Sequence, residues 1–218
     1  MAARISRPLT IGLPKGRILN ALEPLLAQAG IDLEPFKDSR KLLADSPDGR
    51  TRLLLLKPSD VPTYVQYGVA DVGIAGADTL LEDGADLCEP LDLGVGACRL
   101  VVAAPRSTAH HGIDRAWVKV ATKYPNVTRE FFRRRGVEAV IIQLYGSVEL
   151  AAVAGLADLV VDLVESGATL AANDLVEVET IAEVTSRLVV NRASLKTRYH
   201  DIDALTAALR SAVEKGTS

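Results

Sequence analysis

Short apolar segments rich in β-branched residues alternate with helical patterns along most of the chain. Residues 9–13 form a strand-like run, and the apolar residues between Ile18 and Ala29 are spaced for one face of a helix that ends at Gly30. Pro24 lies inside that pattern and is expected to kink or restart the helix. Further strands are predicted at residues 52–56, 69–75, 117–121, 139–144 and 159–164. Such alternation predicts parallel sheet covered by helices.

Two stretches break the alternation. Extended runs at residues 91–95 and 99–104 follow each other without a helix, and so do the runs at 175–184 and 187–191. We interpret these stretches as crossings between two α/β lobes, with the second lobe inserted into the first. Lobe I is expected to comprise residues 1–93 and 180–218, and lobe II residues 94–179.

The composition excludes several classes of protein. With 48% hydrophobic and 24% charged residues the chain can bury a core, so disorder is excluded as its main state. The net charge of −3 and only 4% aromatic residues argue against nucleic acid as a partner. The densest basic cluster, Arg133 to Arg135, is expected to be a solvated helix C-terminus.

Cysteine, histidine and targeting patterns narrow the classes further. Two cysteines and three histidines, without CxxC or HExxH, indicate neither a disulfide framework nor a structural zinc site. No uncharged apolar run approaches the ~20 residues that span a bilayer. Residues 1–17 lack the apolar core of a secretory signal. We therefore expect a soluble, cytoplasmic protein with no membrane partner.

The strongest candidate for chemistry is the turn after the run at 159–164. In open α/β sheets, ligands bind where strands end at their carboxyl side. Gly167 would let the backbone approach an anion, and the Ser166 and Thr169 hydroxyls could help to hold a phosphate. The carboxylates of Asp158, Asp162 and Glu165 suggest a phosphorylated sugar whose hydroxyls donate to them. The alternative is an ordinary tight turn at a helix start.

A second candidate lies after the first strand. Lys15, Gly16 and Arg17 present two cations that suit a polyphosphate, and the alternative is a pair of solvated surface cations. Residues 71–76 are either a ligand loop or a strand with close backbone packing. No nucleophile–base pair stands out: Ser147 follows Gly146 outside a GxSxG context and is expected to cap a helix.

Four segments together carry a resemblance to a known family. They are IGLPKGRI (11–18), KPSDVPTYVQYGVADVGIAGADTLLE (57–82), ATKYPNVTREFF (121–132) and LADLVVDLVESGATLAANDLVEVETIAEVTSRLVVN (156–191). In this order the chain resembles the ATP phosphoribosyltransferase family, the first enzyme of histidine biosynthesis. Because the chain ends at Ser218, it is similar to the short form, which lacks a C-terminal regulatory domain.

The resemblance implies a fold, a reaction and partners. The fold would be two-lobed and periplasmic-binding-protein-like (type II), with a cleft between the lobes. The reaction would transfer the 5-phosphoribosyl group of phosphoribosyl pyrophosphate (PRPP) to N1 of ATP, giving N1-(5-phosphoribosyl)-ATP and pyrophosphate. Mg²⁺ would be bound mainly through substrate phosphates. A homodimer core would assemble with a histidyl-tRNA-synthetase-like regulatory subunit into a hetero-oligomer.

The resemblance also implies roles for residues. Lys15 and Arg17 would be the catalytic cations facing the phosphates. PRPP would contact Asp158, Asp162, Glu165, Ser166, Gly167, Ala168 and Thr169. ATP would contact Leu13, Gly16, Lys57, Gly76, Asp78 and Tyr124. The chain departs from the family pattern where a basic residue is common in the helix start and a glycine follows the Asn, since Ala168, Ala171 and Asp174 stand there.

Two rival functions share these features. A solute-sensing module would use the same two-lobed architecture, but the chain shows neither a secretory signal nor an evident helix-turn-helix segment. Another phosphoribosyltransferase, with a different acceptor base, would use the same phosphate loop. Pyrophosphate release with individual nucleotides would separate the three functions.

Overall fold

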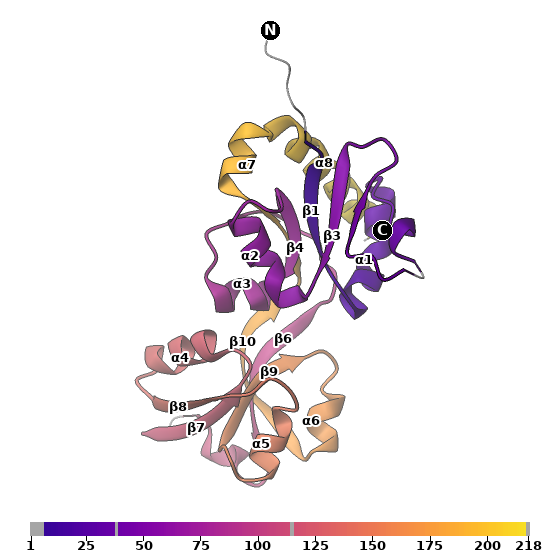
Figure 1. Cartoon of the computed structure of the whole chain (residues 1–218). Coiled ribbons are helices and arrows are strands. Elements are labelled where there is room, and N and C mark those ends of the chain that lie inside the picture. Colours follow the sequence, from indigo (N-terminus) through magenta and orange to yellow (C-terminus); the bar gives the residue numbers. More distant parts are fainter. Residues whose placement is uncertain (1–6, 38, 114–115, 217–218) are drawn as a thin grey trace. The chain divides into compact units, whose positions relative to one another are not determined.

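The computed structural model divides the chain into two compact units, each with its own sheet (Figure 1). It describes residues 7–37, 39–113 and 116–216. Unit 1 comprises Met1–Gly96 and Thr185–Ser218, and unit 2 comprises Ala97–Val184. The boundaries expected after residues 93 and 179 lie N-terminal to these. Residues 1–6 and 217–218 of the predicted lobe I fall outside the described residues.

Unit 1 is built on a six-stranded mixed sheet in the order β2-β3-β1-β4-β11-β5. Its central strands β3, β1 and β4 are parallel, as predicted, whereas β2, β11 and β5 are antiparallel to their neighbours. The strands are β1 (Leu9–Pro14), β2 (Leu43–Asp45), β3 (Thr51–Leu56), β4 (Val72–Gly76), β5 (Cys88–Asp92) and β11 (Ser186–Val190). The prediction did not include β2, and it placed the strand of β5 at 91–95.

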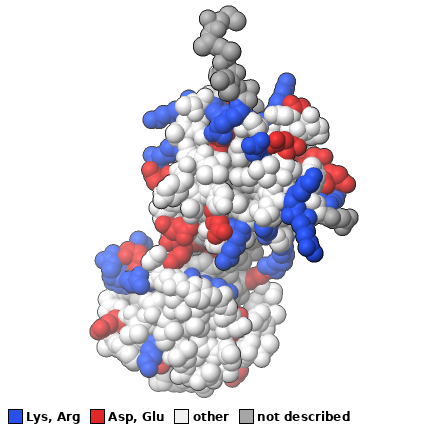
Figure 2. All heavy atoms as spheres, in the orientation of Figure 1, with Lys and Arg blue, Asp and Glu red and all other residues white. Residues whose placement is uncertain are grey.

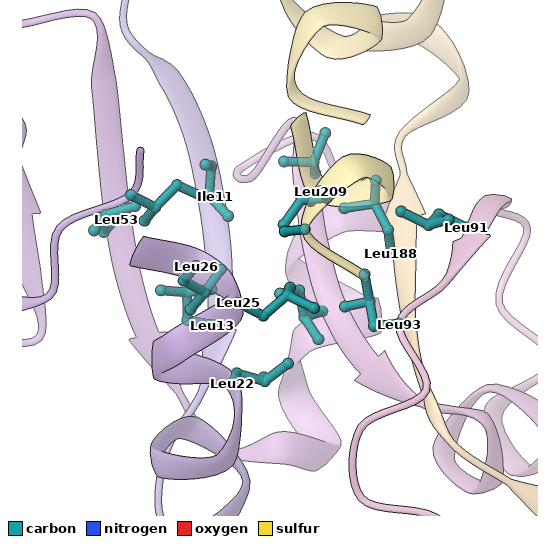
Figure 3. Close-up of a cluster of buried hydrophobic side chains, with 14 of the residues drawn as sticks. Ile11, Leu13, Leu22, Leu25, Leu26, Leu53, Leu91, Leu93, Leu188 and Leu209 are labelled. Atoms are coloured by element: carbon teal, nitrogen blue, oxygen red, sulfur yellow. The ribbon is translucent and has the colours of Figure 1, made fainter. Parts of the chain in front are cut away.

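Helices cover both faces of this sheet. Leu22 and Leu26 of α1 and Leu209 of α8 pack with Ile11 and Leu188 of the sheet in one apolar cluster (Figure 3). On the other face, α2 and α3 bury a second cluster. The helical elements are α1 (Arg17–Gln28), η1 (Glu34–Phe36), η2 (Pro58–Asp60), α2 (Val61–Gln66), α3 (Ala77–Asp83), α7 (Arg192–Thr197) and α8 (Tyr199–Gly216).

Two features of unit 1 resolve expectations about single residues. Pro24 does not end and restart α1, because the helix runs on from Arg17 to Gln28 with Pro24 inside it, and the expected kink stays a prediction. A Cβ on Gly73 would lie 2.7 Å from Val61 and 2.8 Å from Val65. Residues 71–76 are therefore a strand whose glycine permits close packing of α2.

Unit 2 has a five-stranded sheet in the order β10-β6-β9-β7-β8. Strands β8, β7 and β9 are parallel, and β6 runs antiparallel to both β9 and β10. The elements are β6 (Cys98–Pro105), η3 (Ala109–His111), β7 (Trp117–Thr122), α4 (Pro125–Arg134), β8 (Glu138–Gln143), α5 (Glu149–Val153), β9 (Leu159–Val164), α6 (Ala168–Ala172) and β10 (Leu175–Val184). Residues of α5 and α6 pack with the sheet in one apolar cluster.

Two expectations about polar side chains in unit 2 can be compared with the structure, and one is wrong while the other holds for two of three arginines. Ser147 does not cap α5: it has a φ of 45°, and the helix begins two residues later without a side-chain cap. Arg133 and Arg134 are exposed as expected and pair with Glu130, whose pKa is lowered to about 2 by hydrogen bonds from both guanidinium groups. Arg135 instead stacks on Phe131 and pairs with Glu179.

The surface and the described helices agree with the composition. On the face drawn in Figure 2, cationic and anionic side chains are intermingled. None of the described helices is long and apolar enough to cross a membrane. Cys88 and Cys98 are both half-buried.

Candidate functional site

The carboxyl edge of the unit 2 sheet gathers charged side chains from three strands. Parallel strands β7 and β9 both end there, so Lys123 and Tyr124 follow one strand and the turn at 165–169 follows the other. Strand β6 runs the opposite way and begins at this edge, with Arg99 directly opposite Val164. Residues far apart in the sequence therefore surround one turn.

The turn at 165–169 is an exposed, glycine-dependent bend. Gly167 has a φ of 78°, a left-handed conformation that other residues adopt at a cost. The Ser166 hydroxyl accepts a 3.4 Å hydrogen bond from the Ala168 amide. Leu170 is buried and anchors the turn, while Glu165, Ser166, Ala168 and Thr169 are exposed. Such a bend lets backbone amides and hydroxyls approach an anion from solvent.

Asp162 lies at the same edge and is nearly buried, with 8% of its surface exposed. Burial raises the pKa of its carboxyl, while hydrogen bonding from Leu163 and the charge of Lys123 oppose that shift. Lys123 Nζ lies 3.4 Å from Asp162 Oδ2. Lys123 was not among the site residues predicted from the sequence, and only the strand register brings it to Asp162.

Arg99 is a second cation that the sequence analysis missed. Its guanidinium donates to both carboxylate oxygens of Glu177, at 2.8 and 3.1 Å. Glu177 Oε1 in turn lies 3.8 Å from the position that a Cβ on Gly167 would take. Two ion pairs, Lys123–Asp162 and Arg99–Glu177, therefore flank the turn.

Asp158 does not belong to this group. It precedes β9 at the amino end of the strand, whereas the turn follows the carboxyl end. A six-residue strand separates the two by roughly 20 Å. Its carboxylate accepts a 2.8 Å hydrogen bond from the Lys119 amide and fixes the start of the strand. The structure thus separates Asp158 from the other residues predicted for PRPP.

Unit 1 has a corresponding edge. Strands β1, β3 and β4 are parallel, so Lys15, Lys57 and Gly76 lie where neighbouring strands end. The Lys15 amide donates to the Leu56 carbonyl at 2.8 Å, and Gly16 takes a φ of 85° immediately before α1 begins at Arg17.

Carboxylates share this edge with the cations. Asp78 lies in the first turn of α3 with its carboxylate against Gly76. Burial raises the pKa of Asp83, and the nearby charges of Glu82, Asp60 and Asp78 raise it further. The edge therefore offers both cations and carboxylates to a ligand.

The residues predicted for ATP are distributed over both units. Gly16, Lys57, Gly76 and Asp78 lie at the unit 1 edge. Leu13 belongs to that unit too, but its side chain is fully buried in the core, so only its backbone can face a ligand. Tyr124 lies in unit 2, where its amide donates to Thr122 Oγ1 at 2.9 Å.

Fold and site together define a class of protein. Two α/β units, with glycine turns and cations at the carboxyl edges of parallel strands, are typical of proteins that bind phosphorylated small molecules. The same fold occurs in the periplasmic aliphatic sulphonate binding protein SsuA from Escherichia coli, with a TM-score of 0.61 and 15% identity over 95% of this chain and 72% of that one. That likeness concerns the fold alone.

The chain belongs to the ATP phosphoribosyltransferase family, whose model matches residues 57–211. It is 53% identical to ATP phosphoribosyltransferase from Acidithiobacillus ferrooxidans, over 96% of this chain and 99% of that protein. Its identity to the enzyme from Syntrophotalea carbinolica is also 53%, over 89% and 90% of the two chains. The solved structure of the ATP phosphoribosyl transferase (HisG:HisZ) complex from Thermotoga maritima contains a chain with a TM-score of 0.83 and 35% identity, covering 95% of this chain and 99% of that one.

Proposed function

We propose that this chain transfers the 5-phosphoribosyl group of PRPP to N1 of ATP, giving N1-(5-phosphoribosyl)-ATP and pyrophosphate in the first step of histidine biosynthesis. The observation that carries the proposal is the match to ATP phosphoribosyltransferases over nearly the full length of both chains. The exposed glycine turn and the flanking cations of unit 2 would bind the sugar phosphate.

The chemistry asks the site for positioning and charge stabilisation. Adenine N1 attacks C1 of PRPP with a neutral lone pair, and the bond from C1 to pyrophosphate breaks with its electrons leaving on the pyrophosphate. No proton has to be removed before the attack, so the reaction needs no Ser/His or Cys/His pair. Holding two polyanions in line and stabilising the departing charge are the main tasks.

In unit 2, we assign the 5′-phosphate of PRPP to the turn formed by Glu165, Ser166, Gly167, Ala168 and Thr169. Asp162 would accept hydrogen bonds from ribose hydroxyls, because its carboxylate lies at the same edge, where the charge of Lys123 opposes the rise in its pKa that burial causes. Asp158 has no place in this assignment, since it binds the Lys119 amide at the far end of the strand.

In unit 1, Lys15 and Arg17 would stabilise the phosphates and the leaving pyrophosphate. Arg17 starts α1 directly after the left-handed Gly16, which orients the first turn of the helix at the carboxyl edge. Lys57, Gly76 and Asp78 would contact ATP at the same edge, together with the backbone of Leu13. The contact of ATP with Tyr124, which belongs to unit 2, stays a prediction from the sequence.

Magnesium would enter with the substrates. Among the residues that the structure describes, no three His, Cys, Asp or Glu side chains form a group that could hold a metal ion. The ligands of the metal would be mainly phosphate oxygens of PRPP and ATP. Bound there, Mg²⁺ would neutralise charge on the pyrophosphate.

A regulatory partner is part of the proposal. The Thermotoga maritima relative was solved as a HisG:HisZ complex, and this chain covers 99% of the matched chain. We infer that this protein assembles with a HisZ-type subunit, the histidyl-tRNA-synthetase-like partner expected from the sequence, around a homodimer core. We place the assembly in the cytoplasm, as the sequence analysis predicts.

The experiment is a pyrophosphate-release assay with Mg²⁺, PRPP and one nucleotide at a time, with and without the HisZ-type subunit. Release with ATP, and formation of a product that carries ribose on adenine N1, is expected. Release with another base alone would assign a different phosphoribosyltransferase. No release with any base, together with binding of a small solute, would favour a sensor.

A further inference from the structure

The phosphate turn of unit 2 has no cation of its own. Its residues, Glu165 to Thr169, carry one negative side chain and no positive one. The Glu177 carboxylate lies beside it, 3.8 Å from the Cβ position of Gly167. A phosphate dianion in this position would meet two carboxylates, so binding requires a positive charge from elsewhere in the fold.

Of the two cations that flank the turn, Lys123 and Arg99, Arg99 is the one paired with the carboxylate that lies against Gly167. In the ladder between β6 and β9, Arg99 pairs with Val164, the last residue before the turn. Its guanidinium donates at 2.8 Å to Glu177 Oε1, the carboxylate oxygen that lies against Gly167. The Glu177 carboxylate therefore lies beside both the Arg99 guanidinium and the position assigned to the phosphate.

The geometry of the Arg99–Glu177 pair differs from that of an ordinary cross-strand pair. In the ladder, Arg99 opposes Glu183, and Glu177 opposes Ala103. The two side chains thus reach along the sheet to meet, and they leave 36% and 32% of their surfaces exposed. An exposed pair of this kind adds little to folding stability. Both groups remain accessible to a ligand in solution.

We propose that Arg99 binds the 5′-phosphate of PRPP, and that Glu177 holds the guanidinium in position until the phosphate replaces it. The proposal rests on the proposed function, which assigns that phosphate to the turn. A guanidinium can bind phosphate oxygens with two parallel hydrogen bonds. In the pair with Glu177 a single nitrogen, Nη2 of Arg99, donates to both carboxylate oxygens. Glu177 is then a competitor for Arg99, and its removal favours the phosphate.

The test compares both sides of the pair in the full chain, with calorimetry of ribose 5-phosphate and of PRPP. Arg99→Gln should weaken both ligands by roughly tenfold to a hundredfold, because a charged hydrogen-bonding partner is lost. Arg99→Lys should restore part of the affinity. Glu177→Gln should bind both ligands at least as tightly as the original chain. In steady-state kinetics, KM for PRPP should rise in Arg99→Gln while KM for ATP stays unchanged.

Arg106→Gln is the matched control. Arg106 follows the other end of β6 and pairs with Asp174 across exposed surface, so its loss should leave ribose 5-phosphate binding unchanged. Equal weakening by Arg99→Gln and Glu177→Gln would mean that the pair only supports the turn, and would overturn the proposal. So would unchanged affinity in Arg99→Gln, or no binding of ribose 5-phosphate to the original chain. The proposed function fails on a different result, the absence of pyrophosphate release with ATP.

Discussion

Two aspartates, one in each unit, are almost completely buried and have opposite surroundings. Asp71 lies at the amino edge of the unit 1 sheet with no exposed surface. It accepts hydrogen bonds from Arg7 at 2.6 and 2.9 Å, from Ser194 at 2.7 Å, from the Thr10 amide at 3.0 Å and from Arg198 at 3.3 Å. The chain itself satisfies this carboxylate.

Asp162 lies at the carboxyl edge of the unit 2 sheet and has fewer donors. Among the described residues it accepts from the amide of Leu163 at 2.9 Å and from Lys123 at 3.4 Å. A carboxylate offers about four lone-pair sites, so Asp162 keeps capacity for a ligand. The two buried carboxylates therefore have different roles. Asp71 joins Arg7, Ser194 and Arg198 to the sheet through hydrogen bonds. Asp162 keeps hydrogen-bonding capacity for the substrate.

We expect the largest effect, a loss of folding stability, from substitution of Asp71. Asp71→Asn should lower the free energy of unfolding by about 3–5 kcal/mol, because Arg7 loses the charge of Asp71 and the mostly buried Arg198 loses one of its two carboxylate partners. Urea unfolding measures this loss. Asp45→Asn, which removes an exposed partner of Arg52, should lower the free energy of unfolding far less. Equal losses of unfolding free energy in Asp71→Asn and Asp45→Asn would contradict the structural role of Asp71.

Arg17→Ala tests whether the carboxyl edge of unit 1 serves catalysis. Loss of one preorganised donor to the leaving pyrophosphate should lower kcat about a hundredfold or more, with the urea midpoint unchanged. Steady-state assays with ATP and PRPP measure it. Arg192→Ala, an exposed partner of Asp86 in the same unit, should retain normal turnover. Near-normal kcat in Arg17→Ala would remove Arg17 from the site.

Asp162→Asn should affect binding more than folding. Loss of the charged acceptor should weaken PRPP by about tenfold, measured by calorimetry. A loss of several kcal/mol in stability, as for Asp71→Asn, would contradict the contrast.

The pH dependence of Asp162→Asn has a definite sign. Burial raises the folded pKa above the ordinary value of 3.8, so the folded chain holds this proton more tightly than the unfolded chain. The original chain therefore loses stability as pH rises from about the ordinary value through the raised pKa, and the Asn variant does not. The stability of Asn relative to Asp should increase across that window and stay constant above it. Urea unfolding at several pH values measures the difference, and the opposite slope would contradict the raised pKa.

The smallest expected effect is at the end of α6. Asp174 has a φ of 54°, a left-handed conformation, at the position where the resemblance to the family implies a glycine. Asp174→Gly should raise the free energy of unfolding by about 0.5–1 kcal/mol, because glycine adopts this conformation without a steric cost. The exposed pair with Arg106 that is lost contributes little. A lower melting temperature would show that the pair matters more than the backbone.

The strong periodicities predicted most of the fold. The buried runs of β1, β3, β7 and β9 fix their strands, and the central parallel strands follow from the alternation with helices. Strand β2 escaped prediction because it has three residues, none of them buried, and is defined only by pairing with β3. The alternation with helices does not reveal the antiparallel strands β6 and β11, which lie where the chain passes between units.

Only those site residues that directly follow a predicted strand could be found from the sequence. The turn at 165–169 and the residues 15–17 follow strands directly, so the rule for parallel strands finds them. The same rule cannot find Arg99, because it stands at the start of an antiparallel strand that meets the end of β9. It also cannot exclude Asp158, whose carboxylate lies in the same sequence segment but at the opposite edge.

The central claim is that the turn after β9 holds the phosphate of PRPP, and calorimetry of PRPP with Gly167→Val tests it most directly. Gly155→Val is the control, because Gly155 has a φ of 73°, close to the 78° of Gly167, in the same unit but outside the turn. The account predicts that Gly155→Val loses stability but binds PRPP normally, whereas Gly167→Val remains folded and loses measurable binding. Normal PRPP affinity in folded Gly167→Val would contradict it.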